Sequence, residues 1–244
     1  MSLLTPIIWL LVMLPIFILA FFKSKKGNLK FLLLFLVIFL ADNYLQIFSK
    51  QLIPDFLGLK FAWLGKFLSL ALSLSIIYFV NKNVRKEIGF TTSTNSKKQV
   101  KYGILVFLGF LIFDFVFKLI LFPKGGEFDL ETFAFQATMP GLTEELLFRG
   151  IYLWIFDKVF LPNWNLKGIQ FGWGFIIVTL LFGIAHGIIL TSDHQFKFDI
   201  ITILYLTLIS SLSLGILRKF SGNLIYSILG HNVINVMNAI IRIL

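Results

Sequence analysis

Three charged side chains that could take part in chemistry lie within one apolar stretch, TEELLFRG at residues 143–150. On a helix, Glu145 precedes Arg149 by four residues, which is the favourable order for a charge-assisted ion pair. Glu144 is rotated by about 100° from Glu145 around the helix, so it has no partner in its own helix. A buried acid without a cation of its own can accept a proton near neutral pH, and we therefore predict that Glu144 is a general base.

Two histidines occur in later apolar runs, and each shares a helix face with a neighbour four residues away. Phe182 and His186 have this spacing in FGIAHG, and His231 and Asn235 have it in HNVIN. Either histidine alone would more often be a structural residue than a catalyst. Two histidines, together with Glu144 and an amide one turn from the second, favour a catalytic site assembled from three helices.

The composition defines the setting of these residues. The chain has 244 residues, of which 58% are hydrophobic and 14% charged, and its mean hydropathy is +0.90. This is more apolar surface than a soluble core of the same size can bury, so the sequence predicts an integral membrane protein. Cysteine is absent, which excludes disulfides, thiolate metal sites and a cysteine nucleophile. The net charge of +10 lies in short segments between apolar runs, so we do not expect nucleic acid as a partner.

Runs of about 20 apolar residues are long enough to cross the hydrocarbon core of a bilayer as helices. The sequence contains eight such runs, so we expect an all-α, polytopic bundle of about eight transmembrane helices in one integral membrane domain, residues 1–244. The predicted spans are residues 3–22, 29–49, 59–80, 101–122, 137–160, 172–190, 199–217 and 222–243. A short interfacial helix is expected within residues 123–136, before the fifth span.

Lysine and arginine divide the connecting segments into two sets. Fourteen of the 22 Lys and Arg residues lie in segments 23–30, 81–101, 158–172 and 217–220, and six lie in the opposite set. Basic loops tend to remain in the cytoplasm. We therefore expect a multi-pass protein of the cell membrane, with both termini outside and a cytoplasmic linker at residues 81–100.

Other polar residues in the apolar runs have structural interpretations. Asp114 and Lys118 are four residues apart and are expected to form an ion pair on one helix face. Lys66 is expected to extend its ammonium group to the membrane interface. Three residues of the second span are expected to hydrogen-bond a neighbouring helix or to edge a polar cavity: Asp42, Asn43 and Gln46.

Small residues recur at four-residue spacing in two of the predicted spans. Gly183 and Gly187 form one such pair, and Ser211 and Gly215 form another. Small side chains at this spacing allow helices in membranes to approach closely. The pairs therefore predict a compact bundle.

In chain order, the motifs are EExxxR at Glu144, Glu145 and Arg149, FxxxH at Phe182 and His186, and HxxxN at His231 and Asn235. Their order and helical placement resemble those of the CAAX protease and bacteriocin-processing family of intramembrane proteases, also called CPBP or Abi. The resemblance covers a catalytic core at residues 137–240. It does not extend to residues 1–100, which we interpret as variable N-terminal helices and the linker.

The resemblance implies an endopeptidase that cuts a peptide bond in a membrane-associated or lipidated protein or peptide. It implies that Glu144 and His186 activate water, and that His231 and Asn235 bind the developing oxyanion. Three further residues would support the site or pack against it: Glu145, Arg149 and Phe182.

Metal dependence has two interpretations at this point. The family is commonly described as metalloproteases, which implies that Glu144, His186 and His231 could bind a divalent metal such as zinc. The sequence lacks HExxH, in which two histidines one helical turn apart bind the metal. The same residues can activate water without a metal, and we slightly favour this metal-free interpretation.

Two other functions fit parts of the pattern. The same fold could serve as a non-catalytic membrane scaffold or as a bacteriocin self-immunity protein, since the family includes members associated with immunity. Buried acids and histidines also occur in proton-coupled transporters. A transporter is less favoured, because the sequence has neither internal repeats nor obviously broken helices.

Overall fold

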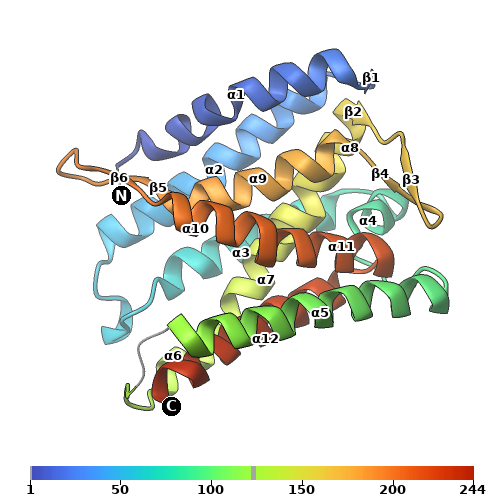
Figure 1. The fold of residues 1–244 in the computed structure, drawn as a ribbon. Helices are drawn as coiled ribbons and strands as arrows, with labels where there is room; N and C mark the ends of the chain where they lie inside the picture. Colours follow the sequence, from blue (N-terminus) through green and yellow to red (C-terminus); the bar gives the residue numbers. More distant parts are fainter. Residues whose placement is uncertain (1, 122–124) are drawn as a thin grey trace.

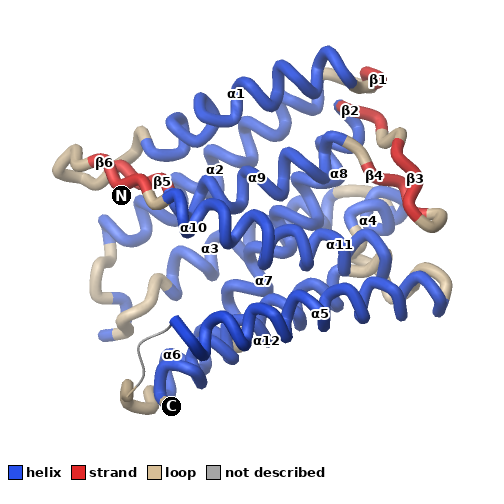
Figure 2. Tube along the Cα trace, viewed as in Figure 1, coloured by secondary structure: helices blue, strands red, loops and turns tan. Residues whose placement is uncertain are grey.

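The computed structural model describes residues 2–121 and 125–244. These residues form a bundle of helices, with small two-stranded antiparallel sheets at its ends (Figure 1, Figure 2). The helices are α1 (Thr5–Lys23), α2 (Lys30–Leu52), α3 (Trp63–Phe79), α4 (Lys82–Ile88), α5 (Lys97–Leu121), α6 (Leu130–Gln136), α7 (Met139–Glu145), α8 (Leu153–Val159), α9 (Trp173–Gly187), α10 (Ile200–Tyr205), α11 (Leu212–Ser221) and α12 (Leu224–Ile243). A 3-10 turn, η1 (Phe56–Gly58), and two π-helical segments, η2 (Leu146–Tyr152) and η3 (Leu206–Ser211), complete the helical elements of the described residues. The strands are β1 (Lys25–Lys26), β2 (Phe160–Leu161), β3 (Trp164–Leu166), β4 (Ile169–Phe171), β5 (Ile188–Leu190) and β6 (Phe196–Phe198).

The predicted all-α membrane bundle is confirmed. Among the described residues, five helices are long and apolar enough to cross a membrane: α1, α2, α5, α12 and the continuous helix formed by α10, η3 and α11. Two shorter apolar helices, α3 and α9, correspond to the third and sixth predicted spans. The fifth predicted span is the continuous helix formed by α7, η2 and α8. Every predicted span therefore contains a helix.

Several predicted boundaries are wrong by three or four residues, including the start of the third span and the end of the sixth. The third span is predicted from residue 59, but α3 begins at Trp63 because the preceding residues form a loop that contains η1. The sixth span is predicted to reach residue 190, but α9 ends at Gly187. Beyond that glycine the backbone is extended, and β5 pairs with β6 instead of continuing the helix.

The helix expected within residues 123–136 is α6, although residues 122–124 lie outside the described part of the chain. The Asp129 side chain caps α6 by accepting a hydrogen bond from the Thr132 N–H. Lys60 forms a salt bridge with Asp129. The hydrogen bond from Lys60 lowers the pKa of Asp129 to about 2, so this carboxylate is charged at physiological pH. Glu131 also accepts hydrogen bonds from Phe61 N and Trp63 Nε1, both at 3.1 Å, and thereby joins α6 to the start of α3.

The core that supports the site is rich in aromatic side chains. Phe35 and Phe39 of α2 pack with Tyr152 of η2 and Phe156 of α8, and all four are at most 1% exposed. The ring centroids of Phe35 lie 4.5 Å from Phe156 and 5.1 Å from Tyr152. Tilted and edge-on contacts of this kind favour one relative placement of the helices. They hold α2 against the helix that carries the glutamates.

The predicted separation of the connecting segments is seen at the two ends of the bundle. At one end, β1 pairs with β2, and the Asn95 N–H donates to the Ser221 carbonyl, so the basic segments lie together (Figure 1). At the other end, the Ser2 N–H donates to the Leu190 carbonyl. The two termini lie toward this second end in Figure 1. The assignment of the basic end to the cytoplasm stays a prediction.

The small residues of α9 produce the close approach that their spacing predicts. A Cβ on Gly183 would lie 2.0 Å from Thr207 Oγ1 and 2.7 Å from the Ile203 carbonyl oxygen. A Cβ on Gly187 would lie 2.7 Å from the Asp199 carbonyl oxygen. Because backbone atoms cannot easily move away, these positions accept only glycine. The contact brings α9, which carries His186, against α10 and η3.

We expect Gly183→Ala to destabilise the protein by about 1–3 kcal/mol, because the added methyl group overpacks the contact between α9 and η3. Gly109→Ala is the matched control, since a Cβ at Gly109 meets no atom within 4 Å. Thermal unfolding of both variants in detergent tests the difference. Equal melting temperatures for the two variants would contradict the close approach.

Candidate active site

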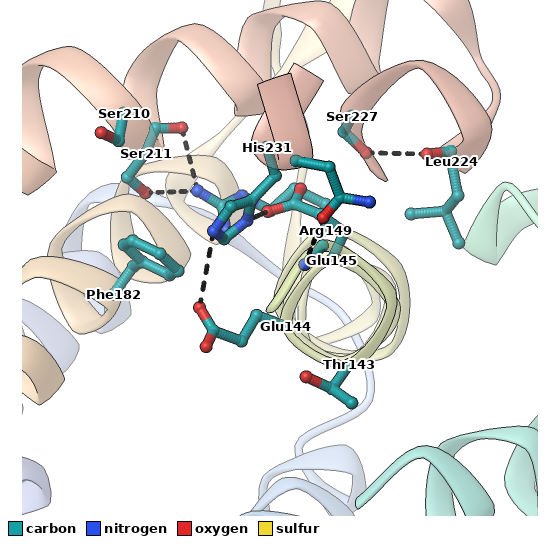
Figure 3. Close-up of polar contacts among 12 residues, drawn as sticks. Thr143, Glu144, Glu145, Arg149, Phe182, Ser210, Ser211, Leu224, Ser227 and His231 are labelled. Carbon is teal, nitrogen blue, oxygen red and sulfur yellow. Dashed lines mark hydrogen bonds and ion pairs between the residues drawn. The ribbon is translucent and has the colours of Figure 1, made fainter. Parts of the chain in front are cut away.

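The pair predicted between Glu145 and Arg149 is present and buried. Arg149 Nη1 lies 2.8 Å from Glu145 Oε1, and the two side chains are 1% and 0% exposed. Arg149 Nη2 also donates to the hydroxyl and the carbonyl oxygen of Ser211, at 3.0 and 3.3 Å (Figure 3). The guanidinium carbon lies 4.3 Å from the ring centroid of Phe182. Arg149 therefore joins the glutamate helix to η3 and to α9.

Both ends of this interaction lie in π-helical segments. Arg149 lies in η2 and Ser211 lies in η3. A π-helical turn has one more residue than an α-helical turn, so it changes the direction in which later side chains point, and such turns are frequent at functional sites. Here the two π segments face each other across the buried guanidinium.

His231 of α12 lies between the two adjacent glutamates. Its Nδ1 is 2.8 Å from Glu145 Oε1, and its Nε2 is 3.9 Å from Glu144 Oε2 (Figure 3). The ring is buried, and a carboxylate can only accept, so Nδ1 carries the proton in this contact. Glu145 thus orients His231 and directs its Nε2 toward Glu144.

His186 of α9 approaches Glu144 from another side. Its Nδ1 is 2.7 Å from the carbonyl oxygen of Phe182, one turn earlier in the same helix. A carbonyl oxygen accepts, so Nδ1–H is the donor, and in the neutral ring Nε2 keeps its lone pair. This Nε2 lies 3.8 Å from Glu144 Oε2. The imidazole side chain is 37% exposed, so it is accessible from outside the bundle core.

Glu144 has a cation partner that its own helix does not supply. Lys66 Nζ of α3 lies 2.7 Å from Glu144 Oε1, and the two side chains are 15% and 16% exposed. The expectation that Lys66 extends to the membrane interface is therefore wrong, as is the premise that Glu144 lacks a cation. The ammonium favours the charged carboxylate and holds Oε1, which leaves Oε2 toward the two histidines.

The structure brings the predicted residues together. Glu144 Oε2 is the point where His186 and His231 converge, and Asn235, one turn after His231, lines the same groove. Lys66 and Ser211 also contribute to the site, through Glu144 and Arg149 respectively. No local spacing identifies either residue, because they come from other helices and are 78 and 62 residues from their partners.

The groove beside these residues has a volume of about 820 Å³. Its walls come from α5, α10, η3 and α12 and are mainly apolar, with Phe113, Phe117 and Leu208 among the lining residues. Glu144, His186, His231 and Asn235 also line it. Large grooves with apolar walls and a few converging polar groups are typical of ligand sites.

The predicted pair of Asp114 and Lys118 is present, with Lys118 Nζ 2.7 Å from Asp114 Oδ2.

The candidate ligands for a divalent metal are Glu144, His186 and His231. Over residues 2–121 and 125–244, no group of three His, Cys, Asp or Glu side chains has a metal-binding arrangement. The ammonium of Lys66 also contacts one oxygen of Glu144, where a second cation nearby would be repelled.

Part of the chain is similar to a known protein family. Residues 126–237 match the family described as Rce1-like, type II CAAX prenyl endopeptidase Rce1-like. No curated protein and no solved structure matches the chain. The match agrees with the resemblance to the CPBP family. The matched segment contains the EExxxR, FxxxH and HxxxN motifs, whereas Lys66 lies outside it.

We expect Arg149→Met to destabilise the protein by about 3–5 kcal/mol, because the substitution leaves the Glu145 carboxylate buried without its cation. Lys158→Met is the control, since Lys158 and its partner Glu87 are 38% and 45% exposed and such pairs contribute at most about 1 kcal/mol. Thermal unfolding in detergent gives both values. A loss for Arg149→Met no larger than that of the control would show that the buried pair does not stabilise the fold.

Proposed function

We propose that this chain, with its Rce1-like segment at residues 126–237, is an intramembrane endopeptidase that hydrolyses a peptide bond in a membrane-associated or lipidated protein or peptide. One observation carries the proposal. Glu144 Oε2 lies 3.8 and 3.9 Å from the Nε2 atoms of His186 and His231, beside an apolar groove of about 820 Å³. A carboxylate and two imidazoles around one point can hold and activate a water molecule.

Glu144 is the proposed general base. The Lys66 ammonium keeps its carboxylate charged, and Oε2 is free to accept a proton from water. His186 Nε2 accepts the second hydrogen bond of that water, because its Nδ1 proton is held by the Phe182 carbonyl. The oxygen of the water attacks the carbonyl carbon, and Glu144 then passes the proton to the leaving amine.

His231 and Asn235 are the proposed oxyanion donors. In its doubly protonated form, His231 donates Nδ1–H to Glu145 and Nε2–H to the developing oxyanion. The Asn235 amide lies one turn further along α12 and lines the same groove. Loss of one such donor typically lowers kcat by about 100- to 1,000-fold. Glu145 and Arg149 act through His231 and through the π segments, so they are positioning residues.

The walls of the groove support an apolar substrate. The side chains from α5 and α10 include Phe113, Phe117 and Leu204, and the groove extends from them to the proposed water-activating residues. A lipid-modified chain or an apolar peptide can bury its surface there, and each buried CH₂ contributes about 0.8 kcal/mol. The scissile bond would then lie beside Glu144.

Glu144→Gln should abolish cleavage of a prenylated CAAX peptide, because an amide cannot accept the proton of the attacking water. The variant should still fold, since glutamine keeps the size of the side chain and its amide oxygen can accept the hydrogen bond from Lys66, but the lost ion pair should lower the melting temperature. Glu127→Gln, at an exposed position before α6, is the control and should cleave at the wild-type rate. Purified proteins in detergent or nanodiscs, with product measured by mass spectrometry, provide the test.

Cleavage by Glu144→Gln at the wild-type rate would contradict the proposed base. A wild-type protein that cuts none of a panel of lipidated and apolar peptides, while catalytic-residue variants still rescue a deletion strain, would instead favour the non-catalytic scaffold or immunity function.

We also expect activity to survive chelation, because the Lys66 ammonium provides the positive charge that keeps Glu144 ionised. Prolonged dialysis against EDTA and 1,10-phenanthroline should leave the initial rate unchanged within a factor of about two, which corresponds to less than 0.5 kcal/mol in the barrier. Metal content is measured on the same sample. A rate that disappears with the chelator and returns with added zinc would contradict the metal-free mechanism.

A further inference from the structure

A second, smaller cavity meets the proposed active site from the opposite side. It has a volume of about 160 Å³ and lies between α2, α3 and the glutamate helix. Glu144 and His186 line both this cavity and the substrate groove. The other polar side chains around it include Asp42, Asn43, Gln46, Lys66 and Ser69, and apolar side chains such as Trp9, Phe39 and Leu147 complete the wall.

The lining of this cavity favours water over an apolar ligand. Asp42 is 4% exposed, and its Oδ2 accepts a hydrogen bond from Gln46 at 2.9 Å. Its Oδ1 and the hydroxyl of Ser69 are buried within reach of each other, and neither forms a well-aligned hydrogen bond with any other group among the described residues. Buried polar atoms are usually satisfied by protein or by ordered water. A polar cavity of this size has room for several water molecules, each with several possible partners.

Hydrolysis needs both a substrate and a water molecule at Glu144, and the two cavities can each hold one of them. A substrate that fills the apolar groove displaces water from that side of Glu144. Each turnover nevertheless consumes one water, whose oxygen bonds to the carbonyl carbon while one proton goes to Glu144. That proton then passes to the amine nitrogen as the C–N bond breaks. The polar cavity reaches Glu144 and His186 without crossing the groove.

We propose that the polar cavity bounded by Asp42, Gln46 and Ser69 is a water-retention site that supplies the hydrolytic water to Glu144 from the side opposite the substrate. This inference rests on the proposed endopeptidase function. It assigns a role to the polar residues of α2 and α3, which lie outside the segment that matches the Rce1-like family. Gln46 acts as a positioning residue, because it holds the Asp42 carboxylate beside the water.

The first experiment uses the wild-type protein without substrate. X-ray radiolysis of water produces hydroxyl radicals that oxidise side chains next to bound water, and the products are located by mass spectrometry. Phe39 lines the cavity and Phe35, one turn earlier in α2, does not. Both are 1% exposed, so they are matched in chemistry and burial. We expect Phe39 to be oxidised several-fold faster than Phe35.

The second experiment removes the polarity of the cavity. Gln46→Met keeps the side-chain volume but loses the hydrogen bond to Asp42. We expect slower oxidation of Phe39 and a kcat that falls roughly tenfold to 100-fold, because the attacking water is less well placed. KM should not change, since the substrate groove is untouched. Gln51→Met, at an exposed position of the same helix, should match the wild type in both measurements.

The outcomes separate this inference from the proposed function. If Phe39 is oxidised as slowly as Phe35, the cavity is dry and the water-retention site is overturned, while cleavage by the wild type would stand. If Phe39 is oxidised but Gln46→Met retains full kcat with an unchanged melting temperature, the water is not on the reaction path, and the inference is also overturned. Failure of the proposed function would instead appear as cleavage that is unaffected by Glu144→Gln.

Discussion

Charge balance in an apolar bundle is the constraint on which the rest of the site depends. Glu144 and Glu145 are adjacent in sequence, so each needs its own cation to remain ionised away from water. Arg149, one turn later, neutralises Glu145 at 2.8 Å, and Lys66 of α3 neutralises Glu144 at 2.7 Å. Arg149 and His231 both donate to Oε1 of Glu145. Lys66 contacts only Oε1 of Glu144, so Oε2 of that carboxylate can face both histidines.

Close packing of the helices supplies partners for the buried Arg149 guanidinium. Arg149 is satisfied only because the π segment η3 presents the oxygens of Ser211 to its guanidinium. Gly183 allows η3 and α9 to approach closely, which in turn places Phe182 over the guanidinium. The backbone carbonyl of the same residue, Phe182, sets the tautomer of His186. Structural and chemical roles are thus shared by the same few residues.

The site also has an apolar groove and a more polar cavity that both reach Glu144. On one side of Glu144 lies the groove of about 820 Å³ with mainly apolar walls, and on the other lies the cavity of about 160 Å³ with Asp42, Lys66 and Ser69. The proposed endopeptidase function requires the site to admit an apolar chain and to retain water at one carboxylate. The helices α2 and α3, which lie outside the Rce1-like segment, contribute most of the polar side. The N-terminal helices therefore contribute to the site in addition to packing around it.

The sequence by itself determined the features that depend on local geometry. Hydrophobic run length predicts the membrane helices, and the four-residue spacing of a helix predicts the pair of Glu145 and Arg149, since both rules involve neighbours along the chain. The tertiary structure alone decided which cation serves Glu144. Lys66 is 78 residues away, and no periodic pattern relates the rotation of α3 to that of α7. The end of α9 at Gly187 and the π segments were likewise set by contacts between elements, because packing against a distant strand or helix decides where regular backbone hydrogen bonding stops.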